Sequence, residues 1–459
     1  MYESFNIQHL QFNISRMSKD FPSSKFERGS RIAKTGIKVG TNYAKRYLKK
    51  KAGQSNGTSD NDFHTENAKE VFKEFTNLRG TALKIAQGMS MDQGFLPEEF
   101  AEVMTQAQYS VPPINKALVR SIIKRELGGY PEKIFRYFES EAFAAASIGQ
   151  VHKAELKDGR KVAIKIQYPN VRETIDSDLS LAKILVKRIV KKGADIDPYF
   201  DEVKSTLLDE TDYINEGKQI DLFRDRFGGL NIVMPEWIEE FSTDKVLCMT
   251  YLEGRHLGDF LKEDPDQRVR DHFGQLLWDF FHQQIQDMDY VHADTHPGNF
   301  LFTYDGKLGV IDFGCVKKFP RSFFMDYLRL LPTHLDDDQD AIRELYEKLK
   351  VINPDSDNPE NEERYFKFAR NYGMTFAEPY KFEVFDFGDE EYRNTIKYFT
   401  KDAPIGNEPR GSQHFLYTTR VHLGLYNLLM KMGAHINTTK SKEILSKLLD
   451  VDFGELVNA

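Results

Sequence analysis

The order of apolar and polar positions predicts a chain made mainly of helices, with strands confined to a few short stretches. Residues 151–168 alternate between apolar and polar and contain an Asp-Gly turn at 158–159, a pattern typical of a strand hairpin. A second short hairpin is predicted at 301–314, and residues 245–254 indicate a strand that ends in a turn. The predicted strands therefore lie in the middle of the chain.

Helical spacing covers most of the remaining sequence. Apolar residues recur every three or four positions at 64–90, at 171–228 and through most of the chain beyond 257. We expect an α+β fold in which a small mixed lobe precedes a large helical lobe, with a strand-to-turn junction near 250–254. Ligands favour such junctions between domains, so this is the first place to look for a site.

The segment at 25–51 is strongly basic, with ten Lys and Arg residues against Glu27 alone. Its apolar and small residues fall near one face of a helix. Such an amphipathic helix either lies on an anionic membrane surface or packs on its own domain as a solvated helix, and the sequence leaves both open. The small polar residues at 52–62 predict a flexible linker.

Composition limits the class of protein. The 459 residues are 40% hydrophobic and 29% charged, which is enough for more than one core. The net charge of -8 disfavours general nucleic-acid binding, and no apolar run of about eighteen residues predicts a spanning helix. The N-terminus lacks a signal-peptide pattern. Cys248 and Cys315 lie far apart, which favours core thiols in a reducing cytoplasm over a disulfide scaffold, a zinc site or a nucleophile.

The stretch VAIK at 162–165 is the first candidate for chemistry. On a strand, Val162 and Ile164 would point one way and Lys165 the other, toward a buried face. An unpaired buried charge is costly, so Lys165 would need a phosphate or a carboxylate as its partner. The alternative is an exposed lysine on an edge strand, because the motif is short.

Just before the hairpin lies AFAAASIGQ at 142–150, where a kinase-type nucleotide site has a glycine-rich turn over the phosphates. The Cβ of alanine resists positive φ and keeps the backbone further from a ligand, so this loop should restrain ordinary nucleotide binding. The alternative is the start of a helix, because alanine is the best helix former. The candidate loop residues are Ala144, Ala145, Ala146 and Ser147.

The stretch HADTHPGN at 292–299, followed by DFG at 312–314, has the spacing of a metal-nucleotide site. In phosphoryl transfer one Asp accepts the proton of the acceptor, an Asn holds magnesium and a later Asp holds it again. Here these residues would be Asp294, Asn299 and Asp312. One amide and one carboxylate suit magnesium, which prefers hard oxygen ligands and takes few from the protein.

These short motifs also permit other interpretations. His292 and His296 stand four apart, as zinc ligands can, but a Pro-Gly pair follows and argues against a helix that would present both. The tripeptide DFG also occurs at 386–388 and 452–454. Only Asp312 follows both the catalytic-type loop and an apolar strand, so we interpret the other two copies as chance.

Taken in order, the small-residue loop, VAIK, the His-x-Asp loop and DFG describe a protein-kinase-like nucleotide site. The chain resembles the UbiB/AarF-type (ADCK-like) atypical kinases, which are linked to quinone biosynthesis. This resemblance implies a two-lobed, protein-kinase-like α+β fold with a helical N-terminal extension. It covers roughly 70–435 and is carried by RGTALKIAQGMS at 79–90, AFAAASIGQVHKA at 142–154, VAIKIQYP at 162–169, ETDYINEG at 210–217, HADTHPGN at 292–299, VIDFG at 310–314 and RVHLGLYNLLMKMGA at 420–434.

The resemblance implies roles for residues around the nucleotide. Lys165 would contact the α- and β-phosphates, and Glu216 would pair with Lys165. Met249 and Tyr251, at the junction after the strand, would face the adenine. Thr250 stands there in place of a common acidic residue, but adenine is normally recognised at this junction through backbone groups.

The resemblance also implies a charged plug over the site where a protein kinase would take its peptide. Lys84 and Gln87 match the N-terminal signature of the family, with Ala86 in place of the usual glycine. Glu210 and Asp212 match its acidic Glu-x-Asp element, so Lys84 would lie near them. From the residues alone, Lys84 would be interpreted as a surface lysine on a helix.

We expect five units along the chain. They are a basic N-terminal segment and linker at 1–62, a helical extension at 63–130, a mixed lobe at 131–252, a helical lobe at 253–435 and a tail at 436–459.

The resemblance implies a magnesium-dependent ATPase or atypical kinase that binds ATP or ADP with Mg²⁺. It would act at a membrane surface in support of isoprenoid-quinone or lipid metabolism, in the cytoplasm or peripherally on the inner membrane. Its partners would be nucleotide, an anionic membrane surface, a quinone-like lipid and a protein complex, but no nucleic acid. A non-catalytic, nucleotide-gated scaffold and a small-molecule phosphotransferase remain alternatives. No Ala-Pro-Glu follows DFG at an activation-loop distance, which disfavours a true protein kinase.

Overall fold

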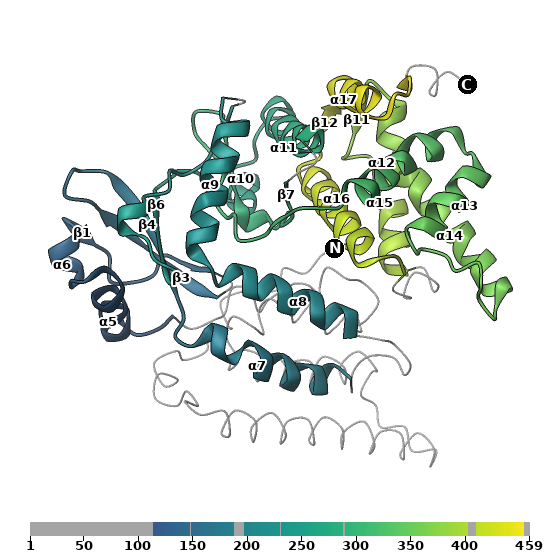
Figure 1. Cartoon of the computed structure of the whole chain (residues 1–459). Helices are drawn as coiled ribbons and strands as arrows, with labels where there is room; N and C mark the ends of the chain where they lie inside the picture. Colours follow the sequence, from purple (N-terminus) through teal and green to yellow (C-terminus); the bar gives the residue numbers. More distant parts are fainter. Residues whose placement is uncertain are drawn as a thin grey trace, which may run out of the picture.

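The computed structural model describes residues 113–146, 148–187, 197–229, 231–287, 290–402 and 410–453. These residues form two lobes, as the sequence predicts: a smaller lobe built on an antiparallel sheet and a larger, helical one (Figure 1). The predicted segments at 25–51 and 52–62 and the signature that contains Lys84 and Gln87 lie outside the described residues. Within the described ranges, none of the helices combines the length and the apolar stretch that crossing a bilayer requires.

The sheet of the smaller lobe runs in the order β1-β3-β4-β6, with β2 paired to the free part of β3. Its strands are β1 (Tyr137–Phe138), β2 (Ala144–Ala146), β3 (Gly149–Glu155), β4 (Lys161–Gln167) and β6 (Val246–Thr250). The hairpin predicted at 151–168 is confirmed as β3 and β4, and Gly159 in its turn has a φ of 92°, which favours glycine. On β4, Val162, Ile164 and Ile166 are fully buried in the core, whereas Lys165 lies on the opposite face.

Helices flank this sheet. Helix α5 begins after Asn115, whose side chain accepts the Leu118 N–H, and ends at Gly128, which has a φ of 77°. Helices α7 and α8 pack against each other, and α9 packs on β6 (Figure 1). The bounds are α5 (Lys116–Leu127), α6 (Pro131–Ile134), α7 (Val171–Val186), α8 (Asp197–Glu210) and α9 (Tyr213–Phe227).

The larger lobe is mainly helical, and its few strands form small separate sheets. The hairpin predicted at 301–314 is confirmed as β8 and β9, and β5 pairs with β9 in parallel. The helices are α10 (Leu257–Lys262), α11 (Gln267–Asp287), α12 (Arg321–Asp336), α13 (Gln339–Lys348), α14 (Pro359–Ala377), α15 (Glu390–Lys397), α16 (Gln413–Met432) and α17 (Thr439–Leu449). The strands are β5 (Ile232–Val233), β7 (Val291–His292), β8 (Phe300–Phe302), β9 (Leu308–Val310), β10 (Val316–Lys317), β11 (Val384–Asp386) and β12 (His435–Asn437). Short 3-10 turns occur at η3 (Glu239–Phe241), η4 (Pro297–Asn299) and η5 (Glu378–Lys381), and η6 (Tyr398–Asp402) is a short π-helix.

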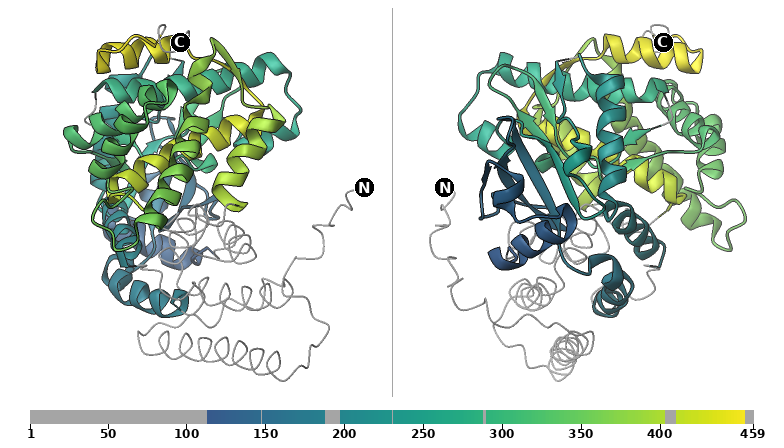
Figure 2. Two further views of the ribbon diagram at one scale, coloured as in Figure 1. Left: turned by 90° about the vertical axis from the view of Figure 1, so that its right-hand side faces the viewer. Right: turned by 60° about the vertical axis from the view of Figure 1, so that its left-hand side comes forward.

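One hydrophobic core extends through both lobes, and a smaller core lies among α12, α13 and α14. Figure 1 and the right-hand view of Figure 2 place the blue strands of the smaller lobe on one side of the molecule and the green and yellow helices on the other. Helix α9 and strand β7, which precedes the His-x-Asp loop, lie between the two sides (Figure 1). The candidate site residues come from these connecting elements and from β4.

The alanine-rich stretch differs from the prediction. We expected a loop, or the start of a helix, but Ala144–Ala146 form strand β2 and pair with β3. Ala146 lies opposite Gly149, so the chain reverses over only two residues. The ladder hydrogen bonds available from β3 outweigh the helix propensity of alanine here. Ser147 lies outside the described residues.

Candidate nucleotide site

Lys165 on β4 forms the centre of the site. Its Nζ lies 2.7 and 2.9 Å from the two carboxylate oxygens of Glu216 and 3.3 Å from Oδ2 of Asp312. Lys165 is 7% exposed and Glu216 is 2% exposed, so water screens this contact poorly. The structure therefore selects the buried position for Lys165 over the alternative of an exposed edge lysine.

Helix α9 presents Glu216 to Lys165. The helix begins at Tyr213, and Asp212 caps it by accepting the Asn215 N–H at 2.9 Å. Glu216 therefore lies in the first helical turn, where the N-terminal end of the helix dipole favours a carboxylate. Sequence reasoning missed Tyr213, whose ring lies 5.2 Å from the Lys165 Nζ. Its position three residues before Glu216 in ETDYINEG was the available signal.

The charges of the site are unequal in number, because one ammonium faces two carboxylates. Burial opposes the charged form of Lys165, but Asp312 and Glu216 outweigh it and raise the lysine pKa well above its ordinary value. Burial raises the pKa of Glu216 to about 7; Lys165 opposes this shift, and the nearby Asp312 and Glu210 add to it. The site thus holds excess negative charge around a lysine that stays protonated.

Asn299 and Asp294 belong to the loop that precedes β8. The Asn299 Nδ2 donates to the Asp294 carbonyl oxygen at 3.1 Å, and Asp294 Oδ1 accepts the His296 N–H at 3.1 Å. The Ile311 N–H donates to the Asn299 carbonyl oxygen at 3.1 Å, which places Asn299 next to the residue before Asp312. The loop and the first DFG turn are therefore tied together through the backbone.

His292 fixes the backbone of the first DFG segment by a hydrogen bond to Asp312. It is 1% exposed, and its Nε2–H donates to the Asp312 carbonyl oxygen at 2.6 Å. Burial lowers the pKa of His292, which favours the neutral ring. Sequence reasoning weighed this histidine as a zinc ligand and missed its positioning contact, although its place two residues before Asp294 was visible.

A zinc site finds no support in the described part of the chain. The His296 Nδ1 accepts the Gly298 N–H at 3.1 Å, so this ring shapes its own loop. No group of three or more His, Cys, Asp or Glu side chains among the described residues could hold a metal ion. Magnesium needs fewer protein ligands, and the site offers the Asp312 carboxylate and the Asn299 amide oxygen. Because the Asn299 Nδ2 donates a hydrogen bond to the Asp294 carbonyl oxygen, the Asn299 amide oxygen is the atom that could bind a cation. The donor set fits magnesium.

The β2–β3 hairpin lies at the sheet edge beside Lys165. Ala144 is opposite Val151, and Val151 is opposite Lys165, so these three residues share one face. Gly149 is required by close packing: a Cβ there would lie 2.4 Å from the Ile166 carbonyl oxygen and 2.8 Å from the Tyr213 hydroxyl. The stretch predicted to cover phosphate is thus held as a paired strand, and its contact with phosphate stays a prediction.

The junction after β6 carries Met249 and Tyr251. Met249 is 6% exposed and lies opposite Ala163, on the face that also carries Lys165. Tyr251 is half-buried, and its N–H donates to the Lys161 carbonyl oxygen at 3.0 Å. The structure therefore puts both junction residues at one end of the site, and their contact with a base stays a prediction.

The acidic element of the predicted plug is divided between two environments. Glu210 is 7% exposed, and a Cβ on Gly314 would lie 3.3 Å from its Cγ, so Glu210 borders the first DFG turn. Asp212 is exposed and serves as the cap of α9. Because Lys84 and Gln87 lie outside the described residues, the plug stays a prediction.

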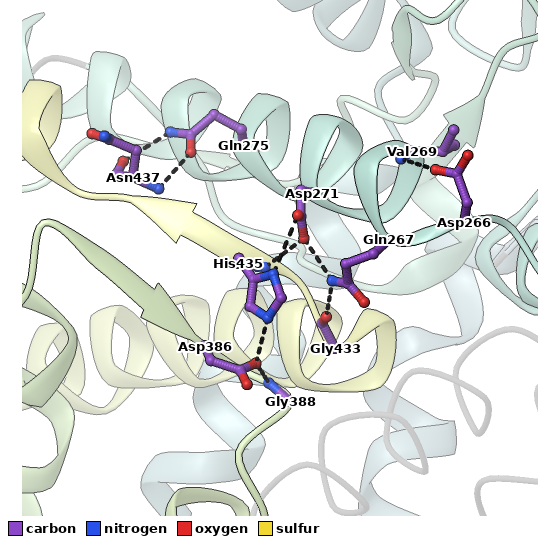
Figure 3. Close-up of polar contacts among 10 residues, drawn as sticks. All are labelled: Asp266, Gln267, Val269, Asp271, Gln275, Asp386, Gly388, Gly433, His435 and Asn437. Carbon is purple, nitrogen blue, oxygen red and sulfur yellow. Dashed lines mark hydrogen bonds and ion pairs between the residues drawn. The ribbon is translucent and has the colours of Figure 1, made fainter.

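The second DFG lies elsewhere, between the end of β11 and α15. Asp386 Oδ1 accepts the Gly388 N–H at 2.6 Å and lies 3.5 Å from the His435 Nε2 (Figure 3). The other ring nitrogen of His435 lies 3.3 Å from Asp271 Oδ2 on α11 (Figure 3). Of the third DFG, Asp452 and Phe453 are described, and Phe453 is buried in the core. Among the three aspartates, Asp312 is the one that contacts Lys165.

Comparison with known proteins bears on this arrangement. A family model described as the ABC1 atypical kinase-like domain matches residues 106–346. The chain is 26% identical over 451 residues to the probable serine/threonine-protein kinase abkA of Dictyostelium discoideum, covering 93% of this chain and 80% of that one. It is 28% identical over 449 residues to the mitochondrial atypical kinase COQ8 of Saccharomyces cerevisiae, covering 94% and 86%.

A solved structure is also similar. The fold resembles that in the complex of Rv3197 with erythromycin from Mycobacterium tuberculosis, with a TM-score of 0.58 and 26% identity. The match covers 84% of this chain and 96% of that one.

Proposed function

The chain belongs to the ABC1 atypical kinase-like family, and we propose that it is a magnesium-dependent ATPase or atypical kinase. The observation that carries the proposal is the buried contact of Lys165 with both Glu216 and Asp312. A buried lysine paired with a glutamate and with the Asp of a DFG turn supports this proposal, because phosphoryl transfer uses such a lysine. The Asp294–Asn299 loop, which is tied to the same turn through Ile311, adds the residue types that hold metal and accept a proton.

The two contacts of Lys165 suggest how phosphate would enter. Glu216 holds the ammonium with both oxygens, at 2.7 and 2.9 Å, whereas Asp312 holds it with one oxygen at 3.3 Å. The longer contact is the easier one to exchange. We infer that Lys165 keeps Glu216 and turns its remaining donors toward the α- and β-phosphates, which frees Asp312 for a metal ion.

Asn299 and Asp312 would hold Mg²⁺, which when bound neutralises the charge that develops on the phosphoryl oxygens. Asp294 would accept the proton of the attacking hydroxyl or water. The bond from the γ-phosphorus to the bridging β-phosphate oxygen would break as a bond to the attacking oxygen forms, and ADP would leave. His292 would act as a positioning residue, because it holds the backbone of Asp312.

We further propose that the protein works at a membrane surface in support of isoprenoid-quinone or lipid metabolism. The basic segment at 25–51 supports this through its charge, since polybasic amphipathic segments bind anionic lipid. The mitochondrial location in the name of the COQ8 relative concerns that protein. For this chain we propose a peripheral place on an inner membrane surface.

A nucleotide-gated scaffold without turnover is the second candidate. It is favoured by the pairing of Ala144–Ala146 with β3, since a paired strand with side chains has less freedom than a glycine loop to fold over phosphates. In that case nucleotide would bind but its γ-phosphate would stay in place.

The test is Mg²⁺-dependent ATP hydrolysis, with and without anionic liposomes, in the wild type and in Asp312→Asn. A liposome-stimulated rate that Asp312→Asn abolishes would support the membrane-coupled enzyme. Binding of nucleotide without turnover in either condition would favour the scaffold. A rate that Asp312→Asn leaves unchanged would refute the assigned site.

A further inference from the structure

Three side chains meet at the end of the smaller-lobe sheet that carries the β6 junction. The Lys153 Nζ lies 5.2 Å from the centre of the Phe143 ring and 4.9 Å from that of Tyr251. The two rings are nearly perpendicular, with centres 5.9 Å apart. Phe143 precedes β2, Lys153 is on β3 and Tyr251 follows β6, so the group, which we call the Lys153 cluster, joins three elements of the sheet.

Strand register places the Lys153 cluster on the face of the candidate site. Lys153 lies opposite Ala163, and Ala163 lies opposite Met249. Val151 and Lys165 are opposite each other one step along the same face. Residues two apart on a strand point the same way and are about 7 Å apart. Lys153 is two residues after Val151, the partner of Lys165, so it lies about 7 Å further along the same face than Lys165.

The two aromatic residues have backbones anchored on two neighbouring strands, β3 and β4. The Phe143 N–H donates to the Val151 carbonyl oxygen at 3.0 Å, beside the β2–β3 hairpin. The Tyr251 N–H donates to the Lys161 carbonyl oxygen at 3.0 Å, at the junction. Their rings therefore hold Lys153 in a limited region, although Phe143 is 44% exposed.

Lys153 keeps its hydrogen-bond donors available. Within the described residues its ammonium makes no ion pair, whereas Lys165 is held by Glu216 and Lys161 lies 3.2 Å from Glu253 Oε1. Contact with ring faces attracts the charge but does not satisfy its three N–H groups as an acceptor would. Lys153 is a half-buried residue whose ammonium has no acceptor among the described residues. Because it is held on the face of the candidate site, it is complementary to an acceptor on a ligand.

We propose that the Lys153 cluster is the outer wall of the base-and-sugar end of the site, and that Lys153 determines nucleotide specificity by donating a hydrogen bond there. The inference rests on the proposed nucleotide binding. Phosphate would occupy the Lys165 end, so the part of a nucleotide within reach of Lys153 is its sugar or base. The acceptor is a sugar hydroxyl or a ring atom of the base, and these two sources can be separated by experiment.

The experiment measures the Kd of ATP, 2′-deoxyATP and GTP with Mg²⁺ for the full chain, for Lys153→Met and for Lys157→Met. Lys157 lies on the exposed β3–β4 turn, so its variant loses the same charge away from the site. Lys153→Met is expected to weaken ATP binding about ten-fold, since a hydrogen bond to a charged group is worth that much. Lys157→Met should bind all three nucleotides as the wild type does.

The pattern across nucleotides identifies the acceptor. If Lys153→Met weakens the binding of ATP and GTP ten-fold but leaves that of 2′-deoxyATP unchanged, the acceptor is the 2′-hydroxyl. If it weakens the binding of ATP and 2′-deoxyATP equally but that of GTP to a different extent, the acceptor is on the base. Phe143→Leu keeps the ammonium but removes one ring, and it should weaken ATP binding about two- to four-fold.

Failure of this inference is distinct from failure of the proposed function. If the wild type binds ATP but Lys153→Met and Phe143→Leu bind all three nucleotides within two-fold of it, the inference is wrong and the proposed function stands. If the wild type binds none of the three nucleotides, the proposed function is wrong and the inference fails with it. Thermal unfolding midpoints equal to that of the wild type would establish that both variants are folded.

Discussion

Residues 312–314 and 386–388 have the same sequence, Asp-Phe-Gly, and both fold into the same local turn. Asp312 Oδ1 accepts the Gly314 N–H at 3.0 Å, and Asp386 Oδ1 accepts the Gly388 N–H at 2.6 Å. Both phenylalanines are buried among other aromatic rings: Phe313 lies against Phe223 and His292, and Phe387 against Trp278, Phe385, Tyr392 and Tyr426. Within the tripeptide the two turns are alike.

The surroundings of the two carboxylates differ. Asp312 faces Lys165, a buried lysine that Glu216 also holds. Asp386 faces His435, a partly exposed histidine that Asp271 also contacts (Figure 3). The Asp294–Asn299 loop is tied through Ile311 to the first turn. The comparison teaches that chemistry at an Asp-Phe-Gly turn depends on the cation and the loop that the fold brings to it.

Matched substitutions should give the largest contrast. In Asp312→Asn and Asp386→Asn the amide oxygen can still accept the glycine N–H, so each turn is kept and one charge is lost. We expect Asp312→Asn to lower Mg²⁺-dependent ATP hydrolysis by at least about 100-fold, because a charge that acts on the metal is removed. Asp386→Asn should stay within about two-fold of the wild type. Steady-state phosphate release measures both, and equal losses would contradict the comparison.

Breaking the buried charge contact should be the next largest effect. Lys165→Met leaves Glu216 and Asp312 without their cation, and we expect a loss of about 3 kcal/mol in the free energy of unfolding. Lys165→Met/Glu216→Gln removes both charges of the pair and should recover part of that loss. Urea unfolding of the two variants and of Glu216→Gln gives the coupling energy. Equal stabilities for the single and double variants would exclude strong coupling between the two residues.

The two regions should respond to pH with opposite signs. His282 supports Trp278 under the second turn: its Nδ1–H donates to the Trp278 carbonyl at 2.7 Å, and its Nε2 accepts from the Tyr380 hydroxyl at 2.6 Å. Burial lowers the pKa of His282 to about 3, below its unfolded value, so its stabilisation is present above about pH 6.5 and is lost as pH falls. This residue should change the free energy of unfolding by at most about 1.4 kcal/mol per pH unit.

Glu216 should give the free energy of unfolding the opposite dependence on pH. Its folded pKa of about 7 lies above the unfolded value, so its contribution is present at low pH and is lost as pH rises through 7. Urea unfolding from pH 5 to pH 8 should show that His282→Gln loses less of its free energy of unfolding toward acid pH than the wild type does. Glu216→Gln should lose less than the wild type as the pH rises toward neutral. Parallel curves for the wild type and both variants would contradict the assigned protonation states.

The smallest effect is expected at the surface contact. His435→Gln loses the ring that bridges Asp271 and Asp386, and because all three side chains are partly exposed we expect a loss of about 1 kcal/mol or less. ATP hydrolysis should not change. Urea unfolding at pH 7 measures the loss, and a defect in nucleotide binding would show that the second turn is coupled to the site.

Sequence patterns predicted the local elements well where the pattern was periodic. Alternation and an Asp-Gly turn predicted the β3–β4 hairpin, and the second short hairpin predicted at 301–314 forms β8 and β9. The pattern failed at Ala144–Ala146, because three alanines carry no alternation and their pairing depends on the free edge of β3. It also missed the contact between Phe143 and Lys153, since residues ten apart in the chain come together here only through the pairing of β2 with β3.

The sequence by itself determined that Lys165 would lie on a strand with Val162 and Ile164 on the opposite face, because side chains alternate along a strand. It left open whether Lys165 would be buried. The shared tripeptide favours one local turn at both Asp312 and Asp386, because an aspartate side chain can accept a backbone N–H two residues further along the chain. Only the tertiary structure decided which turn would meet the lysine. Glu216 and Asp312 are 51 and 147 residues from Lys165, and burial makes their charges interact strongly once packing has brought them together.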